Sequence, residues 1–74
     1  MTFETILPQL KQGAKVIRTG WHGLEEFVCL KEETTLDGET LTPYFVIKVT
    51  GEGYTMFTPT VCDILASDWE IVTP

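Results

Sequence analysis

The sequence has few of the residues from which most metal and catalytic sites are built. It contains one histidine, His22, and two cysteines, Cys29 and Cys62, among 74 residues. A metal site with several imidazole ligands is therefore excluded, and the cysteine spacing is unlike that of a zinc ligand set. A Cys–His catalytic pair requires a thiol beside His22, which no spacing indicates. We expect no metal, no cofactor and no catalytic residue, and we interpret His22 as a solvent-facing bend residue.

Basic residues are also scarce. Five basic residues against eleven acidic ones give a formal net charge of −6. Such a chain repels polyanions and offers few cations to phosphates, which excludes nucleic-acid binding along a groove. A small phosphorylated ligand remains compatible with this charge, because a local pocket containing Arg18, Lys48 or a helix N-terminus is able to hold it.

Long apolar runs are absent as well. No run approaches the roughly 18 residues of a membrane span, and no basic segment precedes a signal-like apolar one. We expect a cytoplasmic protein with no membrane partner, in which both cysteines stay reduced and behave as small buried hydrophobes. A core this small buries only about 60% of the unfolded surface, so we expect a homo-oligomer, a dimer or a tetramer.

The residues that are present predict an α+β fold in a single domain over residues 1–74, with an N-terminal helix and a short second helix packed on an antiparallel sheet. Thr2 is placed to cap the first helix and Gly13 to end it. Pro8 removes a hydrogen bond inside this helix, so the helix is either kinked there or starts later. The expected helices cover residues 2–12 and 61–66, and the expected strands cover residues 14–18, 27–30, 44–49, 54–57 and 69–72.

Local signals refine this outline. The strand over 27–30 is expected to be buried on both faces, because it is apolar without alternation. Residues 31–42 are acidic and threonine-rich around an Asp-Gly pair, which predicts a surface loop or a loose hairpin. Thr60, with Asp63 three residues later, forms a capping-box-like pair at the start of the second helix.

Two tryptophans stand in segments with turn or cap chemistry. Trp21 and His22 lie between Gly20 and Gly23, whose freedom to reach positive φ suits a bend. An indole on such a bend serves either a core or a ligand, and the residue chemistry favours neither. Trp69 lies in an alternating apolar segment, so we interpret it as a core residue.

Several residues have the chemistry to bind a nucleotide. Trp21, Phe3 and the strand over 54–57 offer flat surfaces on which a base stacks, each worth about 1–3 kcal/mol. Thr58, Thr60 and the free N–H groups that open the second helix are donors for a phosphate or a ribose hydroxyl. The alternative is that the aromatic residues only fill the core.

At these residues the chain resembles the Thoeris anti-defence 2 family of small phage proteins. Members open with a Thr-Phe helix that ends in Gly and basic residues, continue to a Gly-Trp-Asn-Gly bend, and finish in a Thr-Pro-Ser-x-x-Asp-Leu-Leu-Ala-x-Asp-Trp segment. This chain has Thr2-Phe3, Gly20-Trp21-His22-Gly23 and the segment from Thr58 to Trp69 in these places. The departures include His22 for asparagine and Met56-Phe57 where tryptophan is common.

The resemblance implies a protein that performs no chemistry. It implies a sponge that sequesters the cyclic ADP-ribose-derived signal of Thoeris TIR proteins, in pockets between the subunits of a homo-oligomer. Because of the departures, a related cyclic dinucleotide is an alternative ligand, and an acidic protein-interaction module is an alternative function. The candidate ligand-binding residues are Phe3, Arg18, Trp21, His22, Gly23, Lys48, Thr58, Pro59, Thr60 and Asp63.

Overall fold

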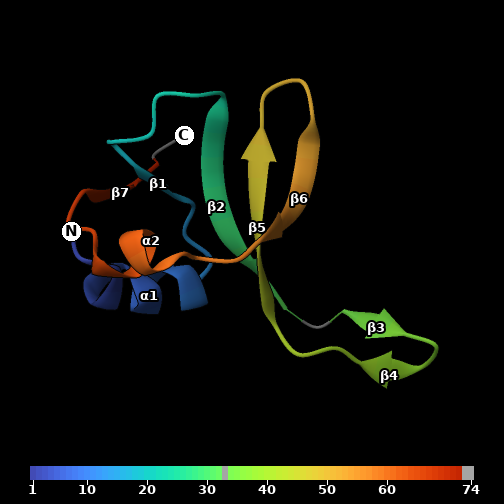
Figure 1. Cartoon of the computed structure of the whole chain (residues 1–74). Helices are drawn as coiled ribbons and strands as arrows, with labels where there is room; N and C mark the ends of the chain where they lie inside the picture. The colour runs from blue at the N-terminus through green and yellow to red at the C-terminus, as the bar shows by residue number, and fades with distance from the viewer. Residues whose placement is uncertain (33, 73–74) are drawn as a thin grey trace.

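The framework of the fold is a five-stranded antiparallel sheet with the strand order β6-β5-β2-β1-β7. A computed structural model describes residues 1–32 and 34–72. The sheet strands are β1 (Val16–Arg18), β2 (Glu25–Lys31), β5 (Tyr44–Val49), β6 (Gly53–Phe57) and β7 (Trp69–Ile71). The first and last strands of the chain therefore pair with each other, and β7 forms one edge of the sheet (Figure 1).

Two helices, α1 (Phe3–Lys11) and α2 (Val61–Leu65), lie together beside one face of the sheet (Figure 1). Thr2 caps α1 by accepting a hydrogen bond from the Thr5 N–H, and Gly13 follows its end with φ of 95°. The helix begins at Phe3 and continues through Pro8, so of the two alternatives for Pro8 the later start is wrong. Pro8 is exposed, which leaves water able to bond the carbonyl that lost its partner.

The core fills the space between α1 and the sheet. Its fully buried side chains are Ile6 and Leu10 from α1, Val16 from β1, Val28 from β2 and Trp69 from β7. The α+β prediction is confirmed, and so is the interpretation of Trp69, whose side chain is 0% exposed.

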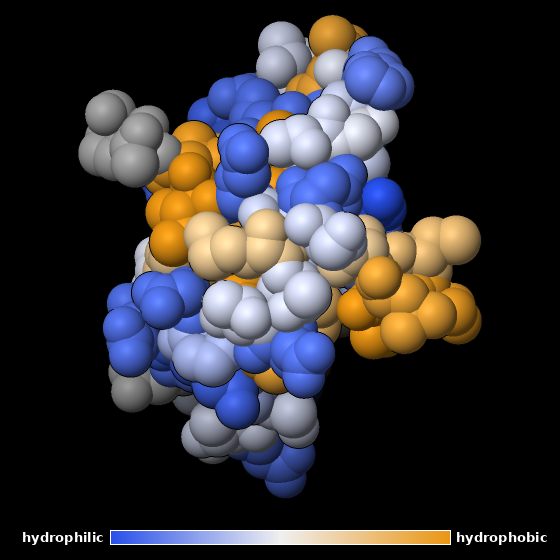
Figure 2. Space-filling view, turned by 90° about the vertical axis from the view of Figure 1, so that its left-hand side faces the viewer, coloured by the Kyte–Doolittle hydropathy of each residue, from blue (hydrophilic) through white to orange (hydrophobic). Residues whose placement is uncertain are grey.

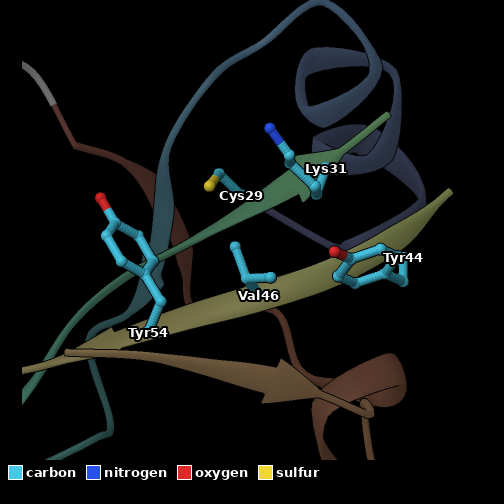
Figure 3. A pocket seen from close by; sticks show the side chains of 5 residues that line it. All are labelled: Cys29, Lys31, Tyr44, Val46 and Tyr54. Atoms are coloured by element: carbon cyan, nitrogen blue, oxygen red, sulfur yellow. The ribbon is translucent and has the colours of Figure 1, made fainter. Parts of the chain in front are cut away.

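The opposite face of the sheet carries no helix within the described residues. Side chains alternate along a strand, so the neighbours of the core residues point to this side. We call it the open face and define it by Cys29, Lys31, Tyr44, Val46, Lys48 and Tyr54, five of which appear in Figure 3. The strand over 27–30 is buried on both faces only at Phe27 and Val28, because Cys29 and Leu30 are half-buried.

A small hairpin stands apart from the sheet (Figure 1). Its strands, β3 (Thr35–Leu36) and β4 (Glu39–Thr40), pair only with each other among the described strands. Asp37 and Gly38 both have positive φ, 52° and 82°, as a two-residue type I′ turn requires. Of the two predictions for residues 31–42, the loose hairpin is confirmed.

The cysteines do not behave as expected. Cys62 is exposed on α2, and Cys29 is half-buried on the open face. The prediction of two buried thiols is wrong, because it assumed that every apolar position of a small chain is needed in the core. The core here comes from α1 and the central strands, and α2 contributes little to it.

Candidate functional site

Trp21 lies at the boundary between the core and the surface. It is half-buried, and its ring packs edge-on against Trp69 at 5.5 Å and against Phe57 at 5.8 Å between centroids. The buried Trp69 ring holds the bend tryptophan in place while part of the Trp21 indole stays accessible. Trp21 therefore supports the core, and the stacking of a ligand on its accessible part stays a prediction.

The glycines on either side of Trp21 lie close to carboxylate side chains, and neither of them has a positive φ. Neither Gly20 nor Gly23 has positive φ, so that expectation is wrong. A Cβ atom on Gly20 would lie 2.6 Å from Asp68 Oδ2, and one on Gly23 would lie 2.7 Å from Glu25 Oε2. The Gly20 N–H donates to Asp68 Oδ2 at 2.8 Å. The bend thus lies close to two carboxylates, and a larger residue at Gly20 would displace the Asp68 carboxylate that Arg18 and the Gly20 N–H hold.

Arg18 joins the bend to the C-terminal part of the chain. Its Nε donates to Asp68 Oδ1 at 2.9 Å, and its Nη1 donates to Asp63 Oδ1 at 2.8 Å. Guanidinium is suited to this task because its planar fork reaches two carboxylates at once. Arg18 and Asp63, both predicted to contact a ligand, are here paired with each other, and their contact with a ligand stays a prediction.

Asp63 is the buried centre of this network. Its Oδ2 accepts hydrogen bonds from the Thr60 N–H at 2.9 Å and the Thr60 hydroxyl at 3.0 Å, which confirms the capping box. Its backbone carbonyl accepts the indole N–H of Trp69 at 2.9 Å. One residue thus fixes the start of α2, the orientation of Arg18 and the ring beneath Trp21.

Both carboxylates have pKa values below the ordinary value. Burial raises the pKa of Asp63, but the hydrogen bonds from Thr60 and Arg18 outweigh burial, so the net pKa is lowered. For Asp68, the hydrogen bond from Arg18 lowers the pKa most, and the Gly20 N–H adds to it. The same contacts, that with Asp68 first, raise the pKa of Arg18. The network is therefore fully ionised near neutral pH.

The other predicted residues, apart from Lys48, lie beside the aromatic rings of the core or on the segments next to them. Phe3 is half-buried between Phe45 and Trp69, at centroid distances of 6.3 and 5.7 Å. His22 and Gly23 are exposed on the bend. Residues 58–60 follow Phe57, which touches Trp21, and within them Thr58 and Thr60 are exposed and Pro59 is half-buried.

Lys48 does not lie near the other predicted ligand-binding residues. It lies on the open face, where its Nζ sits 5.7 Å from the centroid of the Tyr54 ring. The sheet separates it from the core and from Trp21, so the structure does not place Lys48 with the other candidate residues. Alternation along β5 could have indicated this, since Lys48 adjoins the core-facing Ile47.

Sequence reasoning missed Asp68, and it included Phe57 only as part of the strand over 54–57. Asp68 holds both Arg18 and the Gly20 N–H, and Phe57 is the second ring against Trp21. No local pattern connects residue 68 with residues 18 and 20. The aromatic surface expected of the strand over 54–57 includes Phe57, but its contact with Trp21 depends on the fold.

A shallow groove runs between the two helices. It has a volume of about 380 Å³ and includes Phe3, Leu7 and Leu65 in its lining. Figure 2 looks at the molecule from the side on which the helices lie in Figure 1, and hydrophobic side chains reach the surface there in several patches. Val61, Ile64 and Leu65 of α2 are exposed, with Leu65 at 78%.

A second hollow lies on the open face. It has a volume of about 410 Å³ and is lined by Cys29, Lys31, Tyr44, Val46 and Tyr54 (Figure 3). Neither hollow contains a recognisable acid–base pair. Across the described residues, no three His, Cys, Asp or Glu side chains come together as metal ligands, and no helix is long and apolar enough to cross a membrane.

Comparison with known proteins gives a consistent picture. Residues 1–72 match the family model described as the Thoeris anti-defense 2-like domain. The protein Thoeris anti-defense 2 of Bacillus phage SP01 is 35% identical over 85 residues, an alignment that covers 99% of this chain and 96% of that relative. The match therefore includes both the Trp21 bend and the segment from Thr58 to Trp69.

Proposed function

The chain belongs to the Thoeris anti-defense 2-like family, and from this premise we propose that it is a sponge for a nucleotide immune signal. Family membership supports a role in phage anti-defence. The proposed mechanism is finer: the protein binds a cyclic ADP-ribose-derived signal, glycocyclic ADP-ribose, and holds it without degrading it. The Thoeris effector then stays inactive in the cytoplasm of the infected cell.

The observation that supports this mechanism best is the held but accessible Trp21 ring. Because Trp69 and Phe57 contact it at 5.5 and 5.8 Å, the indole loses little freedom when a base stacks on it. Such a stack is worth about 1–3 kcal/mol. A preformed aromatic surface suits tight capture, since ordering it on binding would weaken the affinity.

Polar groups for the rest of the ligand lie on the adjoining segments. His22 is exposed on the bend, and Thr58 is exposed on the segment that follows Phe57. The Thr60 hydroxyl is engaged with Asp63, so we assign Thr60 and Asp63 to shaping the segment and Thr58 to direct contact. Arg18 connects the two segments and keeps them at a fixed separation.

We further propose that the signal pocket is completed by a second subunit. Trp21 is half-buried, so a ligand that stacks on it reaches only part of the ring within one subunit. A second copy placed against this side encloses the ligand and supplies further donors. A homo-oligomer with pockets at subunit interfaces is the arrangement that this proposal requires.

The test is capture and release of an intact signal. The product of an active TIR enzyme is incubated with excess protein, free signal is measured by mass spectrometry, and the protein is then denatured. We expect the free signal to disappear and the intact molecule to return on denaturation. Unchanged free signal overturns the proposal, and recovery of a hydrolysed product indicates an enzyme instead.

Trp21→Ala is the matching variant, and Tyr54→Ala is its control. Both remove an aromatic ring, but Tyr54 is 59% exposed on the open face, away from the bend. We expect Trp21→Ala to lose capture while keeping its circular dichroism spectrum, and Tyr54→Ala to keep capture. Equal capture by the two variants contradicts the assignment of Trp21. Cyclic dinucleotides are included as competitors, because His22 stands where the family has asparagine.

A protein-interaction module is the second candidate function. It is favoured by the exposed apolar side chains of α2, among them Val61 and Leu65, on a chain of net charge −6. A basic host protein recovered in stoichiometric amount, with no nucleotide in the purified protein, would support this alternative. Native mass spectrometry of the fresh protein reports both ligands in one measurement.

A further inference from the structure

The strand β6 forms an edge of the sheet, and its outer side is unpaired. Among the described strands it pairs only with β5, in an antiparallel register from Gly53 to Phe57. Figure 1 shows β6 on the side of the sheet away from both helices. In an antiparallel pair, every second residue directs its N–H and C=O away from the partner strand. The edge therefore presents backbone donors and acceptors with which another extended chain is able to pair.

Features that usually prevent pairing at a sheet edge are missing from β6. Natural edge strands are blunted by short length, charged side chains, proline or a β-bulge. β6 has the five residues Gly-Tyr-Thr-Met-Phe, none of them charged or proline, and its register with β5 advances one for one. The opposite edge, β7, is three residues long and carries the exposed Glu70. Of the two edges, β6 is thus the one suited to a further strand.

The side chains of β6 indicate which strand fits. Tyr54 lies opposite Lys48 of β5, and Met56 lies opposite Val46. Directly opposite residues share a face, so Tyr54 and Met56 both point to the open face, where they are 59% and 72% exposed. A hollow of about 480 Å³ is lined by Met56 together with residues 41–44. An apolar side chain placed beside Met56 by an added strand is able to enter this hollow.

A cation lies near the other exposed position of the edge. Lys48 Nζ sits 5.7 Å from the centroid of the Tyr54 ring, so this lysine reaches from β5 toward β6. Within residues 1–32 and 34–72, the ion pairs formed are those of Arg18, and Lys48 takes part in none. A carboxylate on an added strand, opposite Tyr54, lies within reach of this ammonium group. The edge therefore combines an apolar position with an acid-binding one.

We propose that β6 binds an extended segment of another protein, which adds to the sheet as an antiparallel sixth strand. The segment carries an apolar residue opposite Met56 and, two positions later, an acidic residue opposite Tyr54 and near Lys48. Backbone hydrogen bonds supply the affinity, while the hollow and the lysine select the sequence. This inference goes beyond signal capture and does not depend on it.

A segment of different sequence fits this edge better than a second copy of β6. Antiparallel pairing of two β6 strands about a two-fold axis keeps both open faces on one side of the extended sheet. The lysines of both copies, Lys31 and Lys48 among them, then gather on that side, and β6 contributes no carboxylate to balance them. A partner that brings its own acidic residue avoids this accumulation of like charge.

Binding of a synthetic peptide tests the proposal. The probe is a fluorescent, end-blocked peptide Thr-Thr-Leu-Thr-Glu-Thr-Thr, and fluorescence anisotropy measures its affinity for the full chain. Two further peptides are N-methylated, one at the odd and one at the even positions. Only one set of N–H groups faces β6 in a ladder, so one methylated peptide should lose about tenfold or more in affinity and the other should bind like the parent. Equal affinities of the two overturn the added strand.

Protein variants test the assigned side chains. Met56→Lys places a charge on the edge and should weaken binding about tenfold or more. Leu36→Lys makes the same kind of change at a 62% exposed position of the separate hairpin, and should bind like the unmodified chain. Lys48→Glu should prefer a peptide with lysine in place of glutamate, the reverse of the unmodified chain. A Lys48→Glu variant that still prefers the acidic peptide overturns the assignment.

Light scattering of the same samples shows whether a second copy occupies β6, and circular dichroism confirms that the variants fold. We expect the mass of the protein to change neither in Met56→Lys nor, beyond the mass of the bound peptide, on peptide addition. A mass that falls in either case overturns the proposal and assigns the edge to a second copy. Absence of saturable binding by the parent peptide overturns it as well.

Discussion

Asp63 combines three tasks in one side chain and its carbonyl. It caps α2 through Thr60, holds Arg18, and accepts the indole N–H of Trp69. It is 6% exposed, so its charge is stable only because hydrogen bonds replace the lost water. Loss of that charge therefore affects more than one ion pair.

Acid should destabilise the fold through Asp63 and Asp68. Both folded pKa values lie below the ordinary value of 3.8, so the stabilisation is complete above that value. It is lost as the pH falls from 3.8 through the folded pKa values, where the native carboxylates bind protons. We expect the free energy of unfolding, from urea titrations, to decrease over this range.

Asp63→Asn provides the comparison. The variant should be less stable near neutral pH and should lose less stability on acidification than the unmodified chain. Asp37→Asn, in the exposed hairpin turn, is the control and should follow the unmodified chain. A parallel decrease in Asp63→Asn would show that Asp63 does not carry the acid sensitivity.

At the residue scale, the sequence allowed prediction of local relations but not of distant ones. The burial of Trp69 and the Thr60–Asp63 cap follow from alternation and spacing, and both are confirmed. Arg18 and Asp68 are separated by 50 positions. No short pattern pairs them, so the reason for Gly20 appears only in three dimensions.

The helix α2 is the element most dependent on its cap. It has five residues, and an isolated helix this short is not stable in water. Its first turn is held by the reciprocal bonds between Thr60 and Asp63. The contacts of Asp63 with Arg18 and Trp69 then connect this turn to the sheet.

Thr60→Ala should cost about 1 kcal/mol of stability, as the loss of an N-cap side chain usually does. It should also weaken signal capture, because Thr58 and Pro59 lie directly before the cap. Urea unfolding and a capture assay measure the two effects. Thr60→Ser keeps the hydroxyl and should restore both, whereas Thr42→Ala in an exposed loop should change neither. A Thr60→Ala protein of unchanged stability contradicts the role of the cap.

The ends of the helices and strands were harder to predict than their presence. The first strand is shorter than residues 14–18, because Ala14 and Lys15 precede its pairing with β2 and β7. The second strand is longer than residues 27–30, because β5 pairs along it from Glu25 to Lys31. Strand ends depend on the partner strand, and the partner is not visible in local periodicity.

At the scale of the whole molecule, the charges are separated between surfaces. Three of the four lysines, Lys15, Lys31 and Lys48, lie on the open side of the sheet, whereas residues 32–42 have acidic side chains and no basic one. Composition gave the net charge but not this separation, since it depends on which face each strand residue occupies. Composition also did not show that Lys48 lies on a different face from the residues near Trp21.

A homo-oligomer held together by contacts between lysines and acidic side chains should dissociate more readily at high salt. Raising sodium chloride from 0.1 to 1 M shortens the Debye length from about 10 to about 3 Å. We expect the mass from light scattering to shift toward the monomer over this range. A mass that stays constant or rises with salt would indicate an interface dominated by apolar contacts, such as the exposed side of α2.

The position of β7 has a consequence for how long a ligand stays bound. This strand is three residues long and forms an edge of the sheet, where local opening is easiest. Asp68, directly before it, holds the bend, and Trp69, its first residue, supports Trp21. Detachment of this edge removes the support of the proposed stacking surface while the rest of the sheet remains folded. If the proposed function holds, we expect the residence time of a captured signal to depend on how often this edge opens.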